Sequence, residues 1–289
     1  TPLISVFGGV AGDATVTRIS DDEFWIVSSG ISERYQKRFY KSVQLPENTS
    51  FQSRTEEMCG FNIAGPKSRE ILQRLSNQDL SNKNWRFMRS GNLSIAGVSC
   101  LALRISFTGD LGWEVYCEAS KQQIVYHALI QEAFKERGGP VGSRALMSLR
   151  IEKGYGSWSR EYSPEIWPHE CGLDKFCKLD KEFLNKGELE KKMKTKPRES
   201  LMLIHLNEED CRLSNADATG GEPVFKNGKG LGRVTSGAYG YTVGMSLALG
   251  YLKDVIPGDN VEVMVLGQPH RGKVLKAAPF DPDGIILRG

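Results

Sequence analysis

Residues 61–75 read Phe-Asn-Ile-Ala-Gly-Pro-Lys-Ser-Arg-Glu-Ile-Leu-Gln-Arg-Leu, and this stretch carries three structural signals in a row. The short run Phe61–Ala64 has strand length and leads into Gly65-Pro66, where proline sets the backbone for a first helical turn. Ile71, Leu72 and Leu75 then fall on one face of a helix. The stretch therefore predicts a strand, a tight turn and a helix.

The residues that follow continue this alternation of strands and helices. Residues 93–105 hold two short strand candidates on either side of Ala96-Gly97, and Trp113–Cys117 is another. We expect all of these strands to pair in one sheet. Strand, helix, strands and helix over residues 60–139 predict a small α+β sandwich, a ferredoxin-like subdomain.

The helix of this subdomain that comes second is predicted to start at Ser120. The Ser120 side chain can cap the helix, and Gln123 completes a capping box. Gly138-Gly139 supplies the stop signal. The side chains expected to face inward are those of Ile124, Ala128 and Leu129.

The flanking segments predict a hairpin and two further helices. Ala14–Val27 reads as two β-rich runs joined by the polar turn Ser20–Glu23. Glu33–Val43 has aromatic and apolar residues at helical spacing. Ser143–Lys153 predicts a helix that Gly154 ends.

From Ser200 onward, β-type runs recur at short spacing with almost no helix, and Asn227-Gly228 is a strong hairpin turn. The runs are Leu201–Leu206, Val224–Phe225, Gly232–Thr235, Ser246–Tyr251, Val261–Leu266 and Lys273–Lys276. They imply a separate antiparallel barrel or jelly-roll domain. The charged stretch 185–198 is interpreted as a solvated helix and linker, which places the expected domains at residues 1–195 and 196–289.

The composition is that of a soluble globular protein. The chain has 289 residues, of which 39% are hydrophobic and 25% are charged. Its net charge of +3 is too small for a protein whose affinity rests on neutralising many phosphates, so we expect no nucleic acid partner. No apolar run reaches the roughly 20 residues that a membrane span needs, so we expect no membrane association.

The chemistry-bearing residues form no familiar constellation. The six cysteines are scattered without CxxC pairs, so neither a zinc site nor a disulfide framework is predicted, and we expect thiols in a reducing compartment. The four histidines lie far apart, and none has a triad-like neighbour. The glycines between Gly228 and Gly232 lie in a predicted hairpin with no helix after them, so a phosphate-binding role is not favoured. The chain opens Thr1-Pro2 without an initiator Met, and we expect it to be a fragment of a longer polypeptide.

Two segments hold carboxylates in a suggestive setting. Gly8-Gly9-Val10-Ala11-Gly12-Asp13 precedes a strand, so it is neither a dinucleotide fingerprint nor a P-loop. Its glycines would let the backbone approach a flat ligand and present the Asp13 carboxylate from the strand. A β-turn with a solvated aspartate is the other interpretation.

The second segment is Phe107-Thr-Gly-Asp-Leu-Gly-Trp-Glu114. A turn at Thr-Gly-Asp leads into Trp113 and Glu114, which point to opposite faces of a strand. An inward Glu114 must be paired, and a carboxylate is suited to accept hydrogen bonds from two neighbouring N–H groups of a heterocycle. A surface glutamate on a hairpin is the alternative.

Five blocks together resemble the aminomethyltransferase (glycine cleavage T-protein) family. In the family's order and spacing they are Gly-Gly-x-x-x-Asp at 8–13, Ile63-Ala-Gly-Pro66, Phe107–Glu114, Ser148–Gly154 and Glu170-Cys-Gly-Leu173. Three further blocks resemble the folate-binding half of dimethylglycine and sarcosine dehydrogenases or oxidases more closely, in which a flavin domain precedes this unit. These blocks are Thr235–Tyr241, Ser246–Tyr251 and the ending Phe280–Gly289.

The resemblance implies a three-lobed α+β fold around a hole that takes tetrahydrofolate, with the N-terminal part of the first lobe missing. Asp13 matches the catalytic aspartate beside the reactive folate nitrogens, and Glu114 matches the carboxylate that grips the pterin ring. Phe107 stands where a Tyr is more usual, which removes one hydroxyl. The remaining matches line the folate pocket and are Thr15, Val27, Val115, Tyr116 and Arg150.

The function that the resemblance implies is capture of a one-carbon unit as 5,10-methylene-tetrahydrofolate. The donor would be an N-methylated glycine, dimethylglycine or sarcosine, oxidised by an upstream domain that carries FAD. One alternative is a stand-alone T-protein that works with a lipoyl carrier protein, or a demethylase of another methylated osmolyte. Another is a non-catalytic folate-binding or regulatory relative. The expected location is the cytoplasm, or the mitochondrial matrix in a eukaryote.

Overall fold

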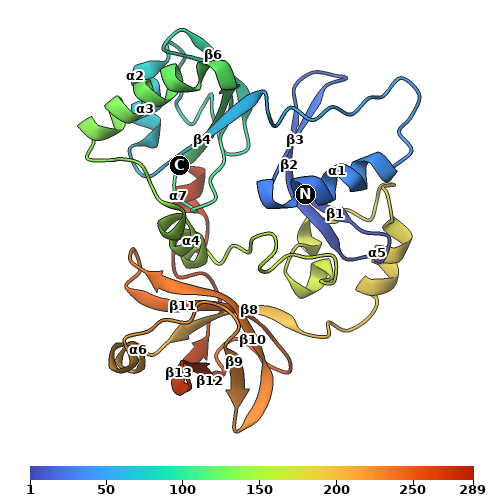
Figure 1. The fold of residues 1–289 in the computed structure, drawn as a ribbon, viewed down its shortest axis with the longest axis vertical. Helices are drawn as coiled ribbons and strands as arrows, with labels where there is room; N and C mark the ends of the chain where they lie inside the picture. The colour runs from blue at the N-terminus through green and yellow to red at the C-terminus, as the bar shows by residue number, and fades with distance from the viewer. The chain divides into compact units, whose positions relative to one another are not determined.

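The computed structural model describes residues 1–289, and the chain divides into two compact units (Figure 1). The first unit comprises Thr1–Thr49 and Gly154–Ala278. The second unit comprises Ser50–Lys153 and Pro279–Gly289. The chain therefore passes from the first unit to the second, returns to the first, and ends in the second.

The second unit is built on a four-stranded antiparallel sheet with the strand order β4-β7-β6-β5. Helices α2 and α3 pack against it, and their buried residues join the core that the strands form. The element bounds are β4 Met58–Ala64, α2 Ser68–Leu75, β5 Ser90–Ile95, β6 Val98–Leu103, β7 Gly112–Glu118, α3 Gln122–Lys135 and α4 Ser143–Glu152. The α+β character predicted for this part of the chain is confirmed.

The start of α3 corrects the sequence prediction. Ala119–Lys121 form a 3-10 turn, and Lys121 occupies the N-cap position without a side-chain cap, so Ser120 and Gln123 make no capping box. The inward face also differs, because Val125 is fully buried whereas Ile124 is 48% exposed. Leu129 is buried and Ala128 packs against the core, as predicted.

The C-terminal segment of the chain completes the second unit with the short helix α7 (Ile285–Arg288). The buried Arg104 side chain donates through Nη2 to the carbonyl oxygen of Leu287 at 2.9 Å. Lys153 and Asp281 form an ion pair at 2.9 Å with both side chains almost fully buried. These contacts fasten the C-terminal segment to the rest of the second unit.

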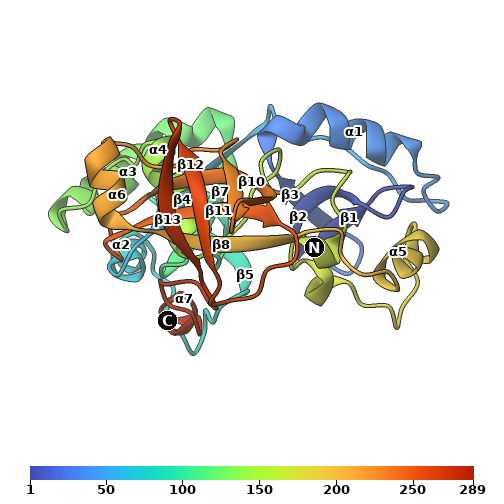
Figure 2. The same cartoon turned by 90° about the horizontal axis from the view of Figure 1, so that it is seen from below.

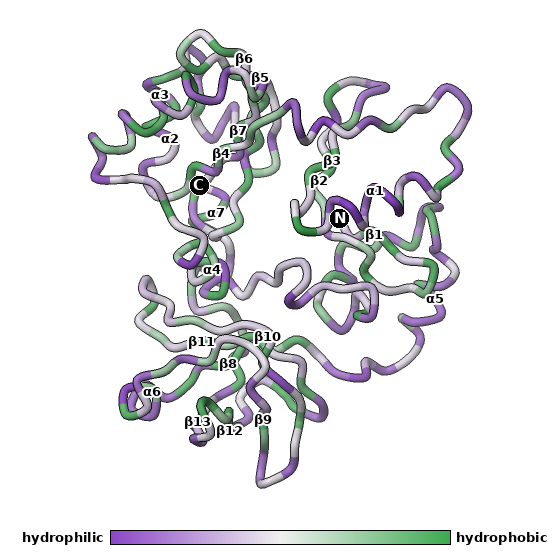
Figure 3. The backbone as a smooth tube through the Cα atoms, viewed as in Figure 1, coloured by the Kyte–Doolittle hydropathy of each residue, from purple (hydrophilic) through white to green (hydrophobic).

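The first unit opens with a three-stranded antiparallel sheet of order β1-β2-β3, formed by Pro2–Ile4, Val10–Arg18 and Phe24–Ser28. The polar turn predicted between β2 and β3 is present and is coloured hydrophilic in Figure 3. Helix α1 (Glu33–Ser42) follows, as the spacing predicts. Helix α5 (Lys186–Met193) lies in the charged stretch and buries only Leu189.

A closed antiparallel barrel forms the rest of the first unit, with the strand order β10-β11-β8-β13-β12-β9 (Figure 2). The strands are β8 Ser200–Leu206, β9 Pro223–Lys226, β10 Lys229–Gly240, β11 Met245–Leu252, β12 Asn260–Val265 and β13 Gln268–Val274. The prediction of a C-terminal antiparallel barrel is confirmed, and Asn227 and Gly228 adopt positive φ at 52° and 76°, as their hairpin turn requires.

Three barrel elements differ from the sequence prediction. Strand β10 runs to Gly240, five residues past the predicted end at Thr235. Strand β13 begins at Gln268, five residues before the predicted Lys273. The prediction missed this part of the strand because its outward side chains are polar and only His270 and Val274 are buried. Helix α6 (Glu208–Ser214) was not predicted, although Asn207 caps it by accepting a hydrogen bond from the Asp210 amide. None of the helices in the molecule has both the length and the apolar character required to cross a bilayer.

Candidate functional site

Asp13 lies on β2, in the middle of the first unit's small sheet. Pro2 pairs with Asp13 across β1, and Thr15 pairs with Val27 across β3. Side chains two residues apart on a strand share a face, and so do directly paired residues. The structure therefore brings Asp13, Thr15 and Val27 together on one face of this sheet.

The glycines before Asp13 allow close packing of the chain on itself. A Cβ atom at Gly9 would lie 1.9 Å from the carbonyl oxygen of Pro164, and one at Gly12 would lie 2.5 Å from Nε2 of Gln36. The space beside these two glycines is thus filled by the protein. Their smallness serves the internal packing that positions β2, which corrects the expectation that they leave room for a flat ligand.

Strand β2, which carries Asp13, contributes Val10 to an apolar cluster with Tyr162, Ile166 and Cys171. Burial raises the pKa of Asp13, and the charged amino group of Thr1 opposes this in part. The pKa values of Tyr162 and Cys171 are also raised, mainly by burial and further by the negative charge of Asp13. A carboxylate in this setting holds a proton more readily than a solvated one, as a general base must.

In the second unit, β7 presents Glu114 and Tyr116 on one face and Trp113 and Val115 on the other. The Tyr116 hydroxyl donates to Oε2 of Glu114 at 2.6 Å. Burial raises the pKa of Glu114, and the hydrogen bond from Tyr116 lowers it in part. Glu114 is therefore a partly buried, oriented carboxylate, and the interpretation as a solvated hairpin residue does not fit it.

Val115 lies in the core of the second unit with 0% of its surface exposed, beside Trp113 at 1%. The alternation along β7 turns its side chain away from Glu114 and Tyr116. The side chain of Val115 therefore cannot line a pocket on the Glu114 face, and only its backbone could contribute to the predicted pocket wall.

Sequence reasoning missed two residues on the Glu114 face. Asn62 on β4 pairs with Glu114, and Gly60 pairs with Tyr116. Both are exposed, and a Cβ atom at Gly60 would lie 2.7 Å from the Tyr116 ring, so glycine is required there for the ring to lie across β4. The two-residue period of Phe61 and Ile63, which pack toward the core, was the signal that could have identified them.

The last two predicted residues also lie in the second unit. Phe107 is partly buried in the loop between β6 and β7. Arg150 lies on α4 and has no exposed surface. Because the Arg150 guanidinium is fully buried, its influence on a ligand would be through charge and through the position of α4.

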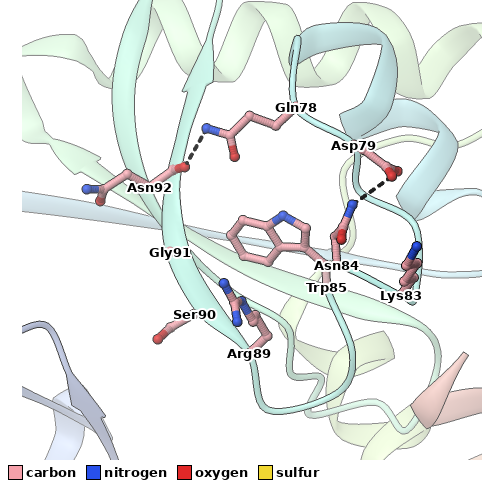
Figure 4. A pocket seen from close by; sticks show the side chains of 9 residues that line it. All are labelled: Gln78, Asp79, Lys83, Asn84, Trp85, Arg89, Ser90, Gly91 and Asn92. Carbon is pink, nitrogen blue, oxygen red and sulfur yellow. Dashed lines mark hydrogen bonds between the residues drawn. The ribbon is translucent and has the colours of Figure 1, made fainter.

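A hollow of about 570 Å³ in the second unit lies apart from these predicted residues (Figure 4). It is an open depression whose edges are held by hydrogen bonds from Asn84 to Asp79 at 2.7 Å and from Gln78 to the Asn92 carbonyl at 3.0 Å. Its floor is the Trp85 ring, which is 6% exposed and belongs to the core. None of the predicted site residues lines it.

No group of three or more His, Cys, Asp or Glu side chains in the structure could hold a metal ion. All six cysteines are free thiols.

The three-stranded sheet, the four-stranded sheet with its helices and the closed barrel make up an α+β fold of the aminomethyltransferase type. The fold matches a crystal structure of the glycine cleavage system aminomethyltransferase T from Bartonella henselae with a TM-score of 0.79 and 18% identity, over 97% of this chain and 75% of the other. The family model of the GCVT N-terminal domain matches residues 1–181, and that of the glycine cleavage T-protein C-terminal barrel domain matches residues 203–281. The chain belongs to the glycine cleavage T-protein family.

Its relatives are enzymes of two kinds. Human mitochondrial dimethylglycine dehydrogenase is 31% identical over 95% of this chain and 32% of its own length. The 4-methylaminobutanoate oxidase (formaldehyde-forming) of Paenarthrobacter nicotinovorans is 32% identical over 97% of this chain and 34% of its own length. An aminomethyltransferase of Desulforamulus reducens is 28% identical over 97% of this chain and 75% of its own length. The chain thus spans about a third of the length of the first two relatives and is an aminomethyltransferase-type domain related to both kinds of enzyme.

Proposed function

We propose that this domain binds tetrahydrofolate and accepts a one-carbon unit on it, forming 5,10-methylene-tetrahydrofolate. The observation that carries the proposal is the Asp13 carboxyl group, which shares a strand face with Thr15 and Val27 and has a pKa raised by burial. Membership of the T-protein family supports folate as the acceptor. The proposed domains are the folate-binding residues 1–195 and the barrel residues 196–289.

The proposed chemistry requires one carboxylate. One folate nitrogen attacks the iminium carbon, the bond from this carbon to the donor nitrogen then breaks so that the donor leaves as an amine, and the second folate nitrogen closes the methylene bridge and loses a proton. Asp13 accepts this proton, and its negative charge also stabilises the cation before attack. The raised pKa of Asp13 suits the proton transfer, since a weakly acidic carboxyl group is a better proton acceptor.

We propose that Glu114 holds the pterin ring by accepting hydrogen bonds from neighbouring N–H groups. The bond from the Tyr116 hydroxyl favours the ionised carboxylate that such binding requires and fixes its orientation. Phe107 lacks the hydroxyl that is more usual in the family, so Tyr116 carries the orienting role in this chain. Arg150 would contribute positive charge from α4.

The proposed donor is an N-methylated glycine oxidised by a flavin domain that carries FAD, because the chain covers about a third of dimethylglycine dehydrogenase. The similarity to a whole aminomethyltransferase favours a second candidate, a T-protein that receives its one-carbon unit from a lipoyl carrier protein. A non-catalytic folate-binding protein is the third. We propose the cytoplasm as its location, or the mitochondrial matrix in a eukaryote.

The proposal is tested by folate binding and by transfer measured separately. Calorimetric titration of the full chain with tetrahydrofolate should show one binding site. With dimethylglycine as the donor in the full-length enzyme, methylene-tetrahydrofolate should form and should depend on Asp13. Absence of folate binding would overturn all the folate-dependent candidates, whereas binding without transfer from any of these donors would leave the non-catalytic one.

A further inference from the structure

Glu161 is a buried carboxylate to which the sequence drew no attention. Its side chain is 1% exposed, and both of its oxygens accept hydrogen bonds. Oε2 accepts from the amide of Ser157 at 2.9 Å and from its hydroxyl at 3.3 Å. Oε1 accepts from the hydroxyl of Thr235 at 2.7 Å and from that of Ser236. Glu161 therefore ties its own loop to barrel strand β10 within the first unit.

The loop around Glu161 is held to the barrel by its backbone as well. The hydroxyl of Tyr251 on β11 donates to the carbonyl oxygen of Glu161 at 2.7 Å. Within the loop, the Tyr162 amide donates to Ser157 at 3.1 Å, and the Ser159 amide donates to Tyr162 at 3.0 Å. Residues 157–162 thus form a compact loop with Glu161 as its attachment point.

The other side of this loop packs toward the strand that carries Asp13. Tyr162, the neighbour of Glu161, joins the apolar cluster with Val10 of β2. The Val10 amide donates to the carbonyl oxygen of Ile166 at 2.9 Å. The negative charge of Asp13 raises the pKa of Tyr162 further, after burial.

We infer that Glu161 is a positioning residue for Asp13: it fixes the 157–162 loop on the barrel so that Tyr162 stays packed with Val10 of β2, the strand that carries Asp13. The inference rests on the proposed role of Asp13. The charged and titratable groups that act on Asp13 or respond to it are the amino group of Thr1, Tyr162 and Cys171. The charge of Glu161 also raises the pKa of Tyr162, so a variant that removes the charge but keeps the shape, Glu161→Gln, separates charge from position.

The test measures the titration midpoint of Asp13. NMR of the full chain, labelled with ¹³C at the aspartate carboxyl groups, monitors this titration. Asp13→Asn assigns the signal. In Glu161→Ala the loop loses its attachment, and we expect the midpoint to fall by about half a pH unit or more, toward that of a hydrated carboxylate. Glu161→Gln keeps the shape and can still accept hydrogen bonds at one oxygen, so it should restore most of the wild-type midpoint.

Glu222→Gln is the matched control. Glu222 accepts hydrogen bonds from the amides of Thr219 and Gly220 at 2.7 Å each, in the same unit, and it has no contact with the 157–162 loop in the hydrogen-bond network. It should leave the Asp13 midpoint unchanged. An equal fall in this control would mean general loosening and would overturn the inference.

If Glu161→Ala does not fold, the double variant Thr235→Val with Ser236→Ala removes the barrel donors to Oε1 and leaves Glu161 in place. It should lower the midpoint in the same direction and by less. An unchanged midpoint in a folded Glu161→Ala, or in the double variant where the former does not fold, refutes the positioning role. This readout is independent of transfer, so a failure of the catalytic role of Asp13 would show separately, as full transfer activity in Asp13→Asn.

Discussion

Replacement of Glu114 by alanine should weaken tetrahydrofolate binding strongly, because the carboxylate is partly buried and already oriented. A charged hydrogen bond contributes about 1.5–3 kcal/mol, and two such bonds to one ring do not add fully. The expected loss is therefore about 2–4 kcal/mol, or roughly 30-fold to 1,000-fold in the dissociation constant. Calorimetric titration of the full chain measures it directly.

Two further variants separate the contributions at this strand. Tyr116→Phe removes the hydroxyl that donates to Glu114 at 2.6 Å, so it raises the pKa of the carboxyl group further and frees its rotation. We expect it to weaken binding by about threefold to tenfold, the value of one neutral donor. Glu118→Ala removes an exposed carboxylate from the same strand and should change the affinity by less than about threefold.

The outcome that refutes this reasoning is an affinity for folate within about threefold of wild type in a folded Glu114→Ala. Such a result would remove Glu114 from the binding site. The folate proposal would then depend on the Asp13 face alone. An equal loss in Glu118→Ala would point to a general effect of charge on this surface.

Three other predictions concern the two units separately. Asp13→Asn should keep folate affinity within a few-fold of wild type and lower methylene transfer by about 10² to 10⁴, measured as methylene-tetrahydrofolate formed; equal activity would exclude the catalytic role. Burial opposes ionisation of Asp281, but the Leu287 amide and the Lys153 ammonium outweigh it and hold its pKa at about 2, below the ordinary 3.8. Its contribution to stability is thus complete above pH 3.8 and is lost as the pH falls toward 2, and thermal melts should show Asp281→Asn without this acid-dependent loss. Gly9→Ala should destabilise the first unit by about 2 kcal/mol or more in chemical unfolding, because its Cβ would lie 1.9 Å from the Pro164 carbonyl oxygen; a change below about 0.5 kcal/mol would mean that the loop moves aside freely.

The sequence predicted most elements where the hydrophobic period is strong. Strand β12, with buried residues at alternate positions, and strand β11, which is buried along almost its whole length, were located within one residue at each end. Strand β13 was displaced because Gln268–Lys273 carries mostly polar outward side chains, and closure against β8 and β12 decides its length. Helix α6 lies between two strands in a segment without a helical period of apolar residues. The N-cap residue Asn207 was the one sequence signal for it.

The candidate site divides in the same way. The common face of Asp13, Thr15 and Val27 follows from strand alternation and from the hairpin register, so local sequence is enough to predict it. The opposite direction of Val115 follows from the same alternation. Glu161 could not be found locally, because its partners Thr235 and Ser236 lie 74 and 75 residues further along the chain.

Burial raises the pKa of both Asp13 and Glu114, yet their neighbours differ in a way that separates their roles. Tyr116 donates a hydrogen bond to Glu114, which stabilises the ionised form, and an ionised carboxylate is what two ligand N–H groups require. No side-chain hydroxyl donates to the Asp13 carboxyl group, so no such hydrogen bond lowers the pKa that burial has raised. A carboxyl group in this state gains more from taking a proton, because protonation relieves the cost of a poorly solvated charge. Binding therefore belongs to the carboxylate with the donor, and proton transfer to the one without it.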